Sequence, residues 1–298
     1  MKKRFFAIFL AVCLVATLLP AGVLAADVEY VYVGGVELAS TDGGTVYATT
    51  DATTGAVITE GANSTNYNIK WDGTTLTLNG ATIKGNSGNG IVYRDGDLTI
   101  WLEGTNKIGE ENDIYSAGSG IYVKGSLTVT GSGTLGVLGL NRGITASNAR
   151  FSGGTVNPPA AATATAGGDY PMGIYAGSVT VDGGTVTAET KGADGYGIYT
   201  DTNGGGVTVT DGSVTAKGKE NGIQTQGNVN ISGGKVVAEG GNVGIWVAPY
   251  KGFSIKITGG EVTVTGGWRS FYENVTIGSE KAPAITIEYG ASAGTMIR

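Results

Sequence analysis

A Gly-Ile dipeptide recurs along most of the chain and is the strongest pattern among its hydrophobic and polar positions. Its copies are Gly90-Ile91, Gly120-Ile121, Gly143-Ile144, Gly173-Ile174, Gly197-Ile198, Gly222-Ile223 and Gly244-Ile245. Neighbouring copies are separated by 30, 23, 30, 24, 25 and 22 residues. A period of this length indicates a stack of short, similar units.

Within each repeat, short stretches alternate apolar and polar residues, which predicts β-strands with one face inward and one outward. Val179-Thr180-Val181 is typical, and Gly184-Thr185-Val186-Thr187-Ala188 follows it after a turn. One coil of such strands cannot bury its own apolar face, whereas stacked coils pair each strand with its equivalents above and below. We therefore predict an all-β fold, a single-stranded right-handed parallel β-helix with about three strands per coil and 22–30 residues per coil.

The two ends of the chain depart from the repeat. Residues 27–68 contain short strand-like stretches without the Gly-Ile period. Because the end of a β-helix exposes unpaired strand edges, we expect these residues to form an N-terminal β cap, with the β-helix proper at 69–298. The sequence leaves open whether Arg298 is the natural C-terminus or whether the β-helix is truncated there.

Residues 1–25 have the features of a secretory signal peptide. Lys2, Lys3 and Arg4 precede an apolar run, and a cleavage point follows Ala25. The apolar run is short for a membrane span. We therefore expect a secreted or cell-surface protein, with no membrane span after signal removal.

The amino-acid composition further limits the partners and reactions to be expected of the chain. The chain has 54 glycines, no histidine and one cysteine, Cys13, which lies inside the predicted signal peptide. Removing residues 1–25 leaves 16 basic and 25 acidic side chains, a net charge of −9. An acidic surface repels phosphate backbones, so we do not expect a nucleic-acid partner. Without histidine, the commonest general base and metal ligand is missing.

The residue after each Gly-Ile pair should point outward, because the isoleucine points inward. In chain order these positions hold Val92, Tyr122, Thr145, Tyr175, Tyr199, Gln224 and Trp246, and Tyr272 follows Phe271 in the last coil. Coils in register would stack Tyr175 on Tyr199 and Trp246 on Tyr272. Exposed aromatic rings are enriched at binding surfaces, but stacked aromatics also stabilise neighbouring strands. The candidate binding residues are therefore Tyr122, Tyr175, Tyr199, Trp246 and Tyr272, with structural stacking as the alternative role.

Catalysis is the less favoured interpretation. Parallel β-helices include polysaccharide hydrolases and lyases, and glycoside hydrolysis requires two carboxyl groups about 5–9.5 Å apart. The acids that stand close together in the sequence, or at equivalent turns, are Glu110, Glu111 and Asp113, Asp95 and Asp97, and Asp182 and Asp211. Turn capping or solvation explains them more simply. We predict no catalytic residues, no metal site and no cofactor, with calcium kept open although no calcium-binding repeat occurs.

Several segments together resemble a known group of proteins. They are Val33-Gly34-Gly35-Val36, Leu76-Thr77-Leu78-Asn79-Gly80-Ala81-Thr82-Ile83, Gly96-Asp97-Leu98-Thr99-Ile100 and Leu102-Glu103-Gly104-Thr105-Asn106. The chain resembles secreted, glycine-rich right-handed parallel β-helix surface proteins of gut Firmicutes, which are often labelled carbohydrate-binding-domain proteins. The resemblance covers most of the mature chain. It implies a cell-surface location in a Gram-positive bacterium and contact with extracellular or host-cell-surface glycans.

Three functions remain as hypotheses from sequence. The first is a non-catalytic glycan-binding or adhesive module that uses the exposed aromatic strip. The second is a structural spacer or interaction rod within a larger surface protein. The third is a polysaccharide lyase or hydrolase. The sequence does not identify the glycan or receptor, the mode of anchoring or the oligomeric state.

Overall fold

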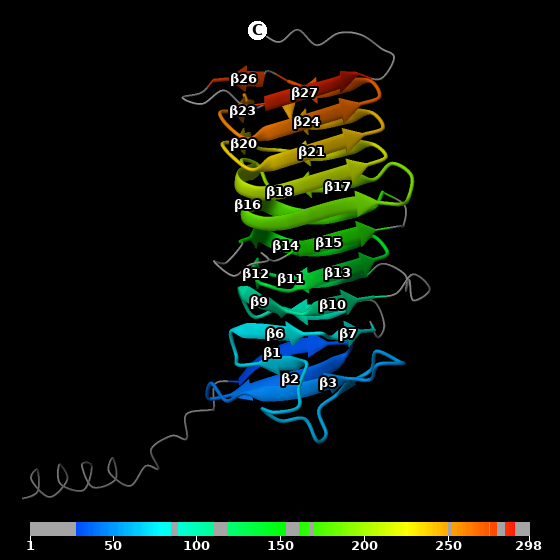
Figure 1. Cartoon of the computed structure of the whole chain (residues 1–298), viewed down its shortest axis with the longest axis vertical. Helices are drawn as coiled ribbons and strands as arrows, with labels where there is room; N and C mark the ends of the chain where they lie inside the picture. Colours follow the sequence, from blue (N-terminus) through cyan, green and yellow to red (C-terminus); the bar gives the residue numbers. More distant parts are fainter. Residues whose placement is uncertain are drawn as a thin grey trace, which may run out of the picture.

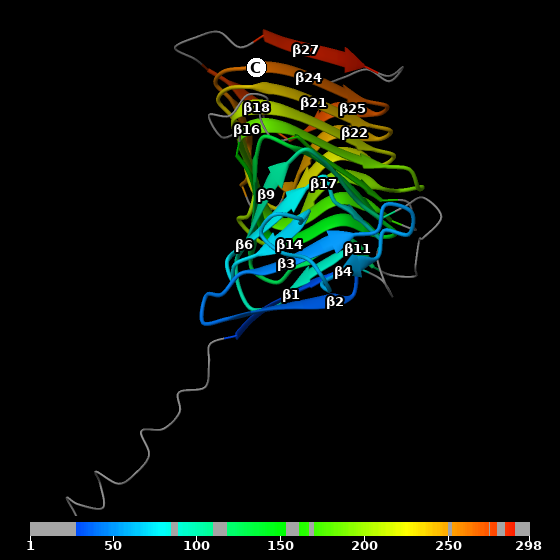
Figure 2. The same ribbon diagram turned by 60° about the horizontal axis from the view of Figure 1, so that its bottom comes forward.

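The computed structural model describes residues 28–84, 89–109, 118–152, 161–166, 170–249, 252–273, 275–278 and 284–289. Within these residues the chain is all β and winds into stacked coils that form a rod (Figure 1). Figure 2 shows the rod tilted, so that its N-terminal, blue end comes forward. The predicted parallel β-helix is therefore the fold of the protein. The predicted signal peptide at 1–25 lies outside the described residues.

Each coil contributes strands to three faces, and strands on one face pair in parallel with their equivalents in neighbouring coils. The first face, called the Gly-Ile face, carries the Gly-Ile pairs. It is formed by β8 (Ile91–Tyr93), β11 (Ser119–Val123), the start of β14 (Arg142–Phe151), the start of β16 (Met172–Thr190), β17 (Tyr196–Thr200), β19 (Asn221–Thr225), β22 (Val243–Val247) and β25 (Arg269–Tyr272).

The second face follows the first along each coil. It is formed by β6 (Thr75–Asn79), β9 (Leu98–Glu103), β12 (Ser126–Gly131), the end of β14, the middle of β16, the start of β18 (Val207–Gly218), β20 (Val229–Ile231), β23 (Ile255–Ile257) and β26 (Val275–Ile277).

The third face closes each coil. It is formed by β7 (Thr82–Ile83), β10 (Thr105–Ile108), β13 (Thr134–Gly139), β15 (Ala161–Ala166), the ends of β16 and β18, β21 (Lys235–Gly240), β24 (Glu261–Gly266) and β27 (Ala284–Tyr289). The Gly-Ile isoleucines, together with the inward residues of the other two faces, form one continuous core along the rod.

Antiparallel strands cover the N-terminal end of the rod. They are β1 (Val28–Val33), β2 (Val36–Thr41), β3 (Val46–Thr50), β4 (Val57–Ile58) and β5 (Ile69–Trp71). The hairpin β1–β2 adds to the Gly-Ile face because β1 pairs antiparallel with β8. The β5 strand pairs antiparallel with β6, the first strand that also has a parallel partner. The N-terminal strands thus occupy strand edges that would otherwise be open to pairing with another chain.

Trp71 anchors this end to the first coil. Its side chain is fully buried, and its indole N–H donates to the carbonyl oxygen of Glu29 at 3.0 Å. Its ring meets the buried ring of Tyr93 edge-on, with 5.6 Å between centroids and 64° between planes. The Tyr93 hydroxyl in turn donates to a carboxylate oxygen of Glu29 at 3.2 Å. Tyr93 is thereby part of the core and not of the outward strip that begins one residue earlier.

Two glycine positions show why the repeat is rich in this residue. At Gly197, a Cβ atom would lie 2.6 Å from the backbone nitrogen of Lys217 and 2.7 Å from the carbonyl oxygen of Gly222. At Gly234, in the bend just before the third-face strand β21, φ is +71°, a conformation that costs glycine little and other residues more. Both the close approach of neighbouring coils and the tight corner therefore require glycine.

Candidate functional site

The outward positions of the Gly-Ile face form one line along the rod. Strand register makes partners of Val92 and Tyr122, Tyr122 and Thr145, Thr145 and Tyr175, Tyr175 and Tyr199, Tyr199 and Gln224, Gln224 and Trp246, and Trp246 and Tyr272. We call the five aromatic members, Tyr122, Tyr175, Tyr199, Trp246 and Tyr272, the aromatic column. All five are half-buried, so each ring reaches the surface while its base packs against neighbours.

Four members of the aromatic column form two stacked pairs. The rings of Tyr175 and Tyr199 lie 5.9 Å apart with 9° between their planes. The rings of Trp246 and Tyr272 lie 5.9 Å apart with 23° between their planes. Tyr122 has no ring partner among the described residues.

The two interruptions of the aromatic column differ in their surroundings. Thr145 occupies an outward position but is only 7% exposed, and its hydroxyl lies 2.7 Å from that of Ser119. Gln224 remains half-exposed, and its side-chain oxygen accepts a hydrogen bond from the Asn221 amide at 2.6 Å. This bond leaves the Gln224 amino group as a donor for an external acceptor.

A second row of side chains lies beside the aromatic column and is absent from the sequence-based candidates. The guanidinium carbon of Arg142 lies 4.0 Å from the centroid of the Tyr175 ring. The rings of Tyr196 and Tyr199 lie 5.2 Å apart and are tilted by 53°. At the other pair, Arg269 lies 5.4 Å from the Tyr272 ring, and Trp268 lies 5.8 Å from it.

These neighbours determine which ring faces remain open. Arg142 belongs to the coil before Tyr175, while Tyr199 belongs to the coil after it, so the two faces of the Tyr175 ring are covered from opposite sides. Tyr199 and Trp246 each have one stacked partner, on the side away from Gln224. We infer that their remaining faces border the coil of Gln224. The backbone positions of Tyr199 and Trp246 are two strand spacings apart, a distance of about 9.6 Å.

The hydroxyl groups of Tyr175 and Tyr196 stay protonated at neutral pH. Burial, together with a hydrogen bond to the Asp201 carboxylate, raises the pKa of Tyr175 to about 12. Burial, and after it the negative charge of Glu220, raises the pKa of Tyr196 above its ordinary value. The surface thus offers apolar ring faces, neutral hydroxyl groups, an amide and two guanidinium groups. This combination suits a ligand with both apolar C–H faces and hydroxyl groups.

Three of the acids considered in the sequence have partners in the structure, namely Asp97, Asp182 and Asp211. Asp182 and Asp211 are register partners, but Asp182 is ion-paired with Arg150 and Asp211 accepts the backbone N–H of Gly212 at 2.7 Å. Asp97 accepts the backbone N–H of Ser126 in the next coil at 2.7 Å. Glu110, Glu111 and Asp113 lie outside the described residues. Among the residues that the structure describes, no three His, Cys, Asp or Glu side chains gather closely enough to hold a metal ion.

No helix within the described ranges is both long and apolar enough to cross a membrane. Neither the curated proteins nor the solved structures gave a match to this chain. One family model matches residues 34–267, which span the N-terminal strands from β2 onward and most of the coils, and its description is "Carbohydrate-binding domain-containing protein". Since this match covers well over half of the chain, the protein belongs to the family of carbohydrate-binding domain-containing proteins.

Proposed function

We propose that the protein is a non-catalytic module that binds an extracellular polysaccharide or cell-surface glycan through the aromatic column. The observation that carries the proposal is the placement of Tyr199 and Trp246 on either side of Gln224, with one ring face of each free of a stacked partner. The family to which the chain belongs supports the same class of ligand.

The geometry suits a sugar ring for a simple steric reason. Two aromatic rings in contact with opposite faces of one intervening ring must stand about twice a van der Waals contact of 3.5–4.0 Å apart. The Tyr199 and Trp246 positions are about 9.6 Å apart along the rod, a spacing of the same order, with Gln224 on the strand between them. The Gln224 side-chain oxygen is held by Asn221, and its amino group can donate to a sugar hydroxyl or ring oxygen.

Secretion and domain layout complete the proposal. Residues 1–25 direct the chain out of the cell, residues 27–68 cap the rod, and residues 69–298 form the β-helix that displays the aromatic column. An extracellular location places the column where polysaccharides and host glycans are found. Adhesion to a glycan-bearing surface is the biological role that fits this arrangement.

The experiment compares glycan binding of the mature chain with that of three single variants. Trp246→Ala and Tyr199→Ala each remove one of the two bordering rings, and we expect polysaccharide affinity to fall about tenfold or more. Trp101→Ala is the matched control, because Trp101 is 37% exposed on the second face, away from the column. Binding is measured on a glycan array and by affinity electrophoresis, with circular dichroism confirming the fold.

The proposal fails if the parent chain binds none of the glycans tested. It also fails if Trp246→Ala and Tyr199→Ala are retained as well as the parent, because the rings then serve only to stabilise adjacent strands. A loss of binding by Trp101→Ala alone would move the site to the second face.

A further inference from the structure

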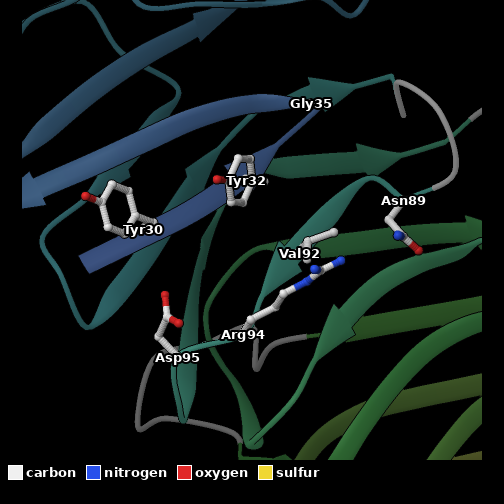
Figure 3. A pocket seen from close by; sticks show the side chains of 7 residues that line it. All are labelled: Tyr30, Tyr32, Gly35, Asn89, Val92, Arg94 and Asp95. Carbon is white, nitrogen blue, oxygen red and sulfur yellow. The ribbon is translucent and has the colours of Figure 1, made fainter. Parts of the chain in front are cut away.

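A cavity of about 490 Å³ opens where the hairpin β1–β2 meets the first coil (Figure 3). Its lining comes from Tyr30 and Tyr32 on β1, from Val92 on β8, and from the neighbouring Asn89, Arg94 and Asp95, with Gly35 at the hairpin turn. We call it the cap cavity. Its volume lies in the range of small-molecule sites, which is about 300–1,000 Å³.

The cap cavity exists because two antiparallel strands separate. The β1 strand pairs with β8 only at Tyr32↔Val92 and Val33↔Ile91. Continued pairing would place Tyr30 opposite Arg94. The β8 strand ends at Tyr93, however, and the chain then turns through Gly96, whose φ is +152°. The space between Tyr30 and this turn is therefore not closed by backbone hydrogen bonds.

Two tyrosine rings form an apolar wall of the cap cavity. Tyr30 and Tyr32 are 36% and 40% exposed, whereas the members of the aromatic column are half-buried. The Tyr32 hydroxyl donates to a Glu37 carboxylate oxygen at 2.6 Å, which holds the ring in place. Large exposed aromatic side chains beside a cavity are typical of binding sites.

The polar groups around the cavity retain unused hydrogen-bonding capacity. The Asn89 side-chain oxygen accepts the backbone N–H of Ser119 at 2.7 Å, which leaves its amino group as a donor. Within the described ranges, neither the Arg94 guanidinium nor the Asp95 carboxylate has a hydrogen-bond or ion-pair partner. Figure 3 shows these two side chains diverging, with Arg94 directed toward Val92 and Asp95 toward Tyr30.

The signs of these charges constrain the ligand. A simple anion would bind near Arg94 but meet the carboxylates of Asp95 and Glu37, and a simple cation would meet the guanidinium group. A neutral ligand with hydroxyl groups can donate to Asp95 and accept from Arg94 at the same time. The exposed tyrosine rings require that the same ligand also have an apolar face.

We propose that the cap cavity binds a single neutral pyranose unit, with its C–H face against Tyr30 and Tyr32 and its hydroxyl groups on Arg94 and Asp95. This site adjoins the first member of the aromatic column, because Val92 in its lining is the register partner of Tyr122, but it is distinct from the Tyr199 and Trp246 positions. It lies between the N-terminal hairpin and the first coil, whereas Tyr199 and Trp246 lie several coils away. The two proposals share a class of ligand but depend on different residues.

The test titrates the ¹⁵N-labelled mature chain with methyl glycosides of glucose, galactose, mannose and N-acetylglucosamine, and with methyl glucuronoside as the acidic comparison. We expect saturable amide shifts confined to residues 30–35 and 89–95, at ligand concentrations up to about 10 mM. Arg94→Ala should weaken this binding about tenfold, because it removes hydrogen bonds from a charged donor. Asp95→Asn should weaken it less, since the amide keeps one acceptor oxygen.

The controls separate this site from the column and from general charge effects. Lys107→Ala removes an exposed cation on the third face and should leave the titration unchanged. Trp246→Ala should also leave it unchanged while lowering polysaccharide retention. Absence of saturable shifts at residues 30–35 and 89–95, or equal affinity in Arg94→Ala and the parent, overturns the proposal. Binding of the glucuronoside alone overturns the neutral ligand.

Discussion

Tyr175 and Tyr199 are register partners on adjacent coils, and their rings stack with 5.9 Å between centroids and 9° between planes. Such a pair contributes to stability whether or not it also contacts a ligand. We predict a coupling free energy of about 0.5–1.5 kcal/mol between the two rings. A double-mutant cycle with Tyr175→Ala and Tyr199→Ala, measured by guanidinium denaturation, gives this value directly. A coupling indistinguishable from zero would show that the stacked geometry contributes nothing in solution.

The alkaline titration of the protein should reveal tyrosines with strongly raised pKa values. The pKa of both Tyr175 and Tyr93 is about 12, in each case mainly because burial disfavours the phenolate. The unfolded chain loses these protons near pH 10, before the folded chain does, so folding stability falls as the pH rises from about 10 to 12. Absorbance at 295 nm should show a late phase that becomes smaller in Tyr175→Phe. A parent titration complete by pH 11 would contradict the burial of these hydroxyl groups.

Gly197 should tolerate no side chain. Because a Cβ atom there would meet backbone atoms at 2.6 and 2.7 Å, we expect Gly197→Ala to lower the free energy of unfolding by about 1–3 kcal/mol or more. Gly136→Ala is the matched control. Its nearest neighbour would be the Asn106 carbonyl oxygen at 3.8 Å, and alanine suits a strand better than glycine. Thermal melts of the two variants should therefore shift in opposite directions, and equal shifts would argue against the close approach of the coils.

A buried hydroxyl pair next to the Gly-Ile face should be sensitive to removal of one member. The hydroxyl groups of Thr200 and Thr225 are fully buried and lie 2.7 Å apart, and that of Thr225 also accepts the backbone N–H of Gly227 at 2.9 Å. Thr225→Val leaves the buried Gly227 N–H without its acceptor and the Thr200 hydroxyl with only the Gly205 carbonyl oxygen, at 3.3 Å, so we expect a loss of about 1–3 kcal/mol. Thr208→Val, at an outward position of the second face, should change stability by less than about 0.5 kcal/mol. Denaturant midpoints of the two variants test this, and similar midpoints would contradict it.

The register of the Gly-Ile face could be predicted from sequence because one short signal marks it in every coil. Ile174, Ile198 and Ile223 are register partners and are fully buried. The alignment of these isoleucines also determined which residues follow them on the outer surface. The fold class and the stacking of Tyr175 on Tyr199 thus followed from spacing alone. The role of the aromatic column in carbohydrate binding stays a prediction.

The second row beside the aromatic column could not be predicted by simple alternation. Tyr196 and Tyr199 are three residues apart, so alternation places them on opposite sides of the strand. Both reach the surface because Gly197 and Ile198, between them, are both buried, which breaks the two-residue period. Both residues of a Gly-Ile pair are buried, so the residue just before the pair reaches the surface as well as the residue just after it. This rule would have identified Tyr196 and, at the equivalent positions, Arg142 and Arg269.

The cap cavity lay beyond sequence reasoning for a different reason. It depends on the antiparallel pairing of Tyr32 with Val92, residues that are far apart in the chain and belong to no common repeat. Periodicity reports neighbours only within a repeated unit. The contact between a unique N-terminal hairpin and the first coil must therefore be seen in three dimensions.

The parallel ladder of the Gly-Ile face also determines how such a chain can change its length. Every internal coil offers the same hydrogen-bonding edge above and below, so tandem duplication of one coil would insert without disturbing the strands on either side. Each insertion would lengthen the rod by about 4.8 Å and add one outward position after its Gly-Ile pair. Gene lengthening in steps of whole coils would thus extend the surface without redesigning the core, whereas a gain of half a coil would misalign all three faces.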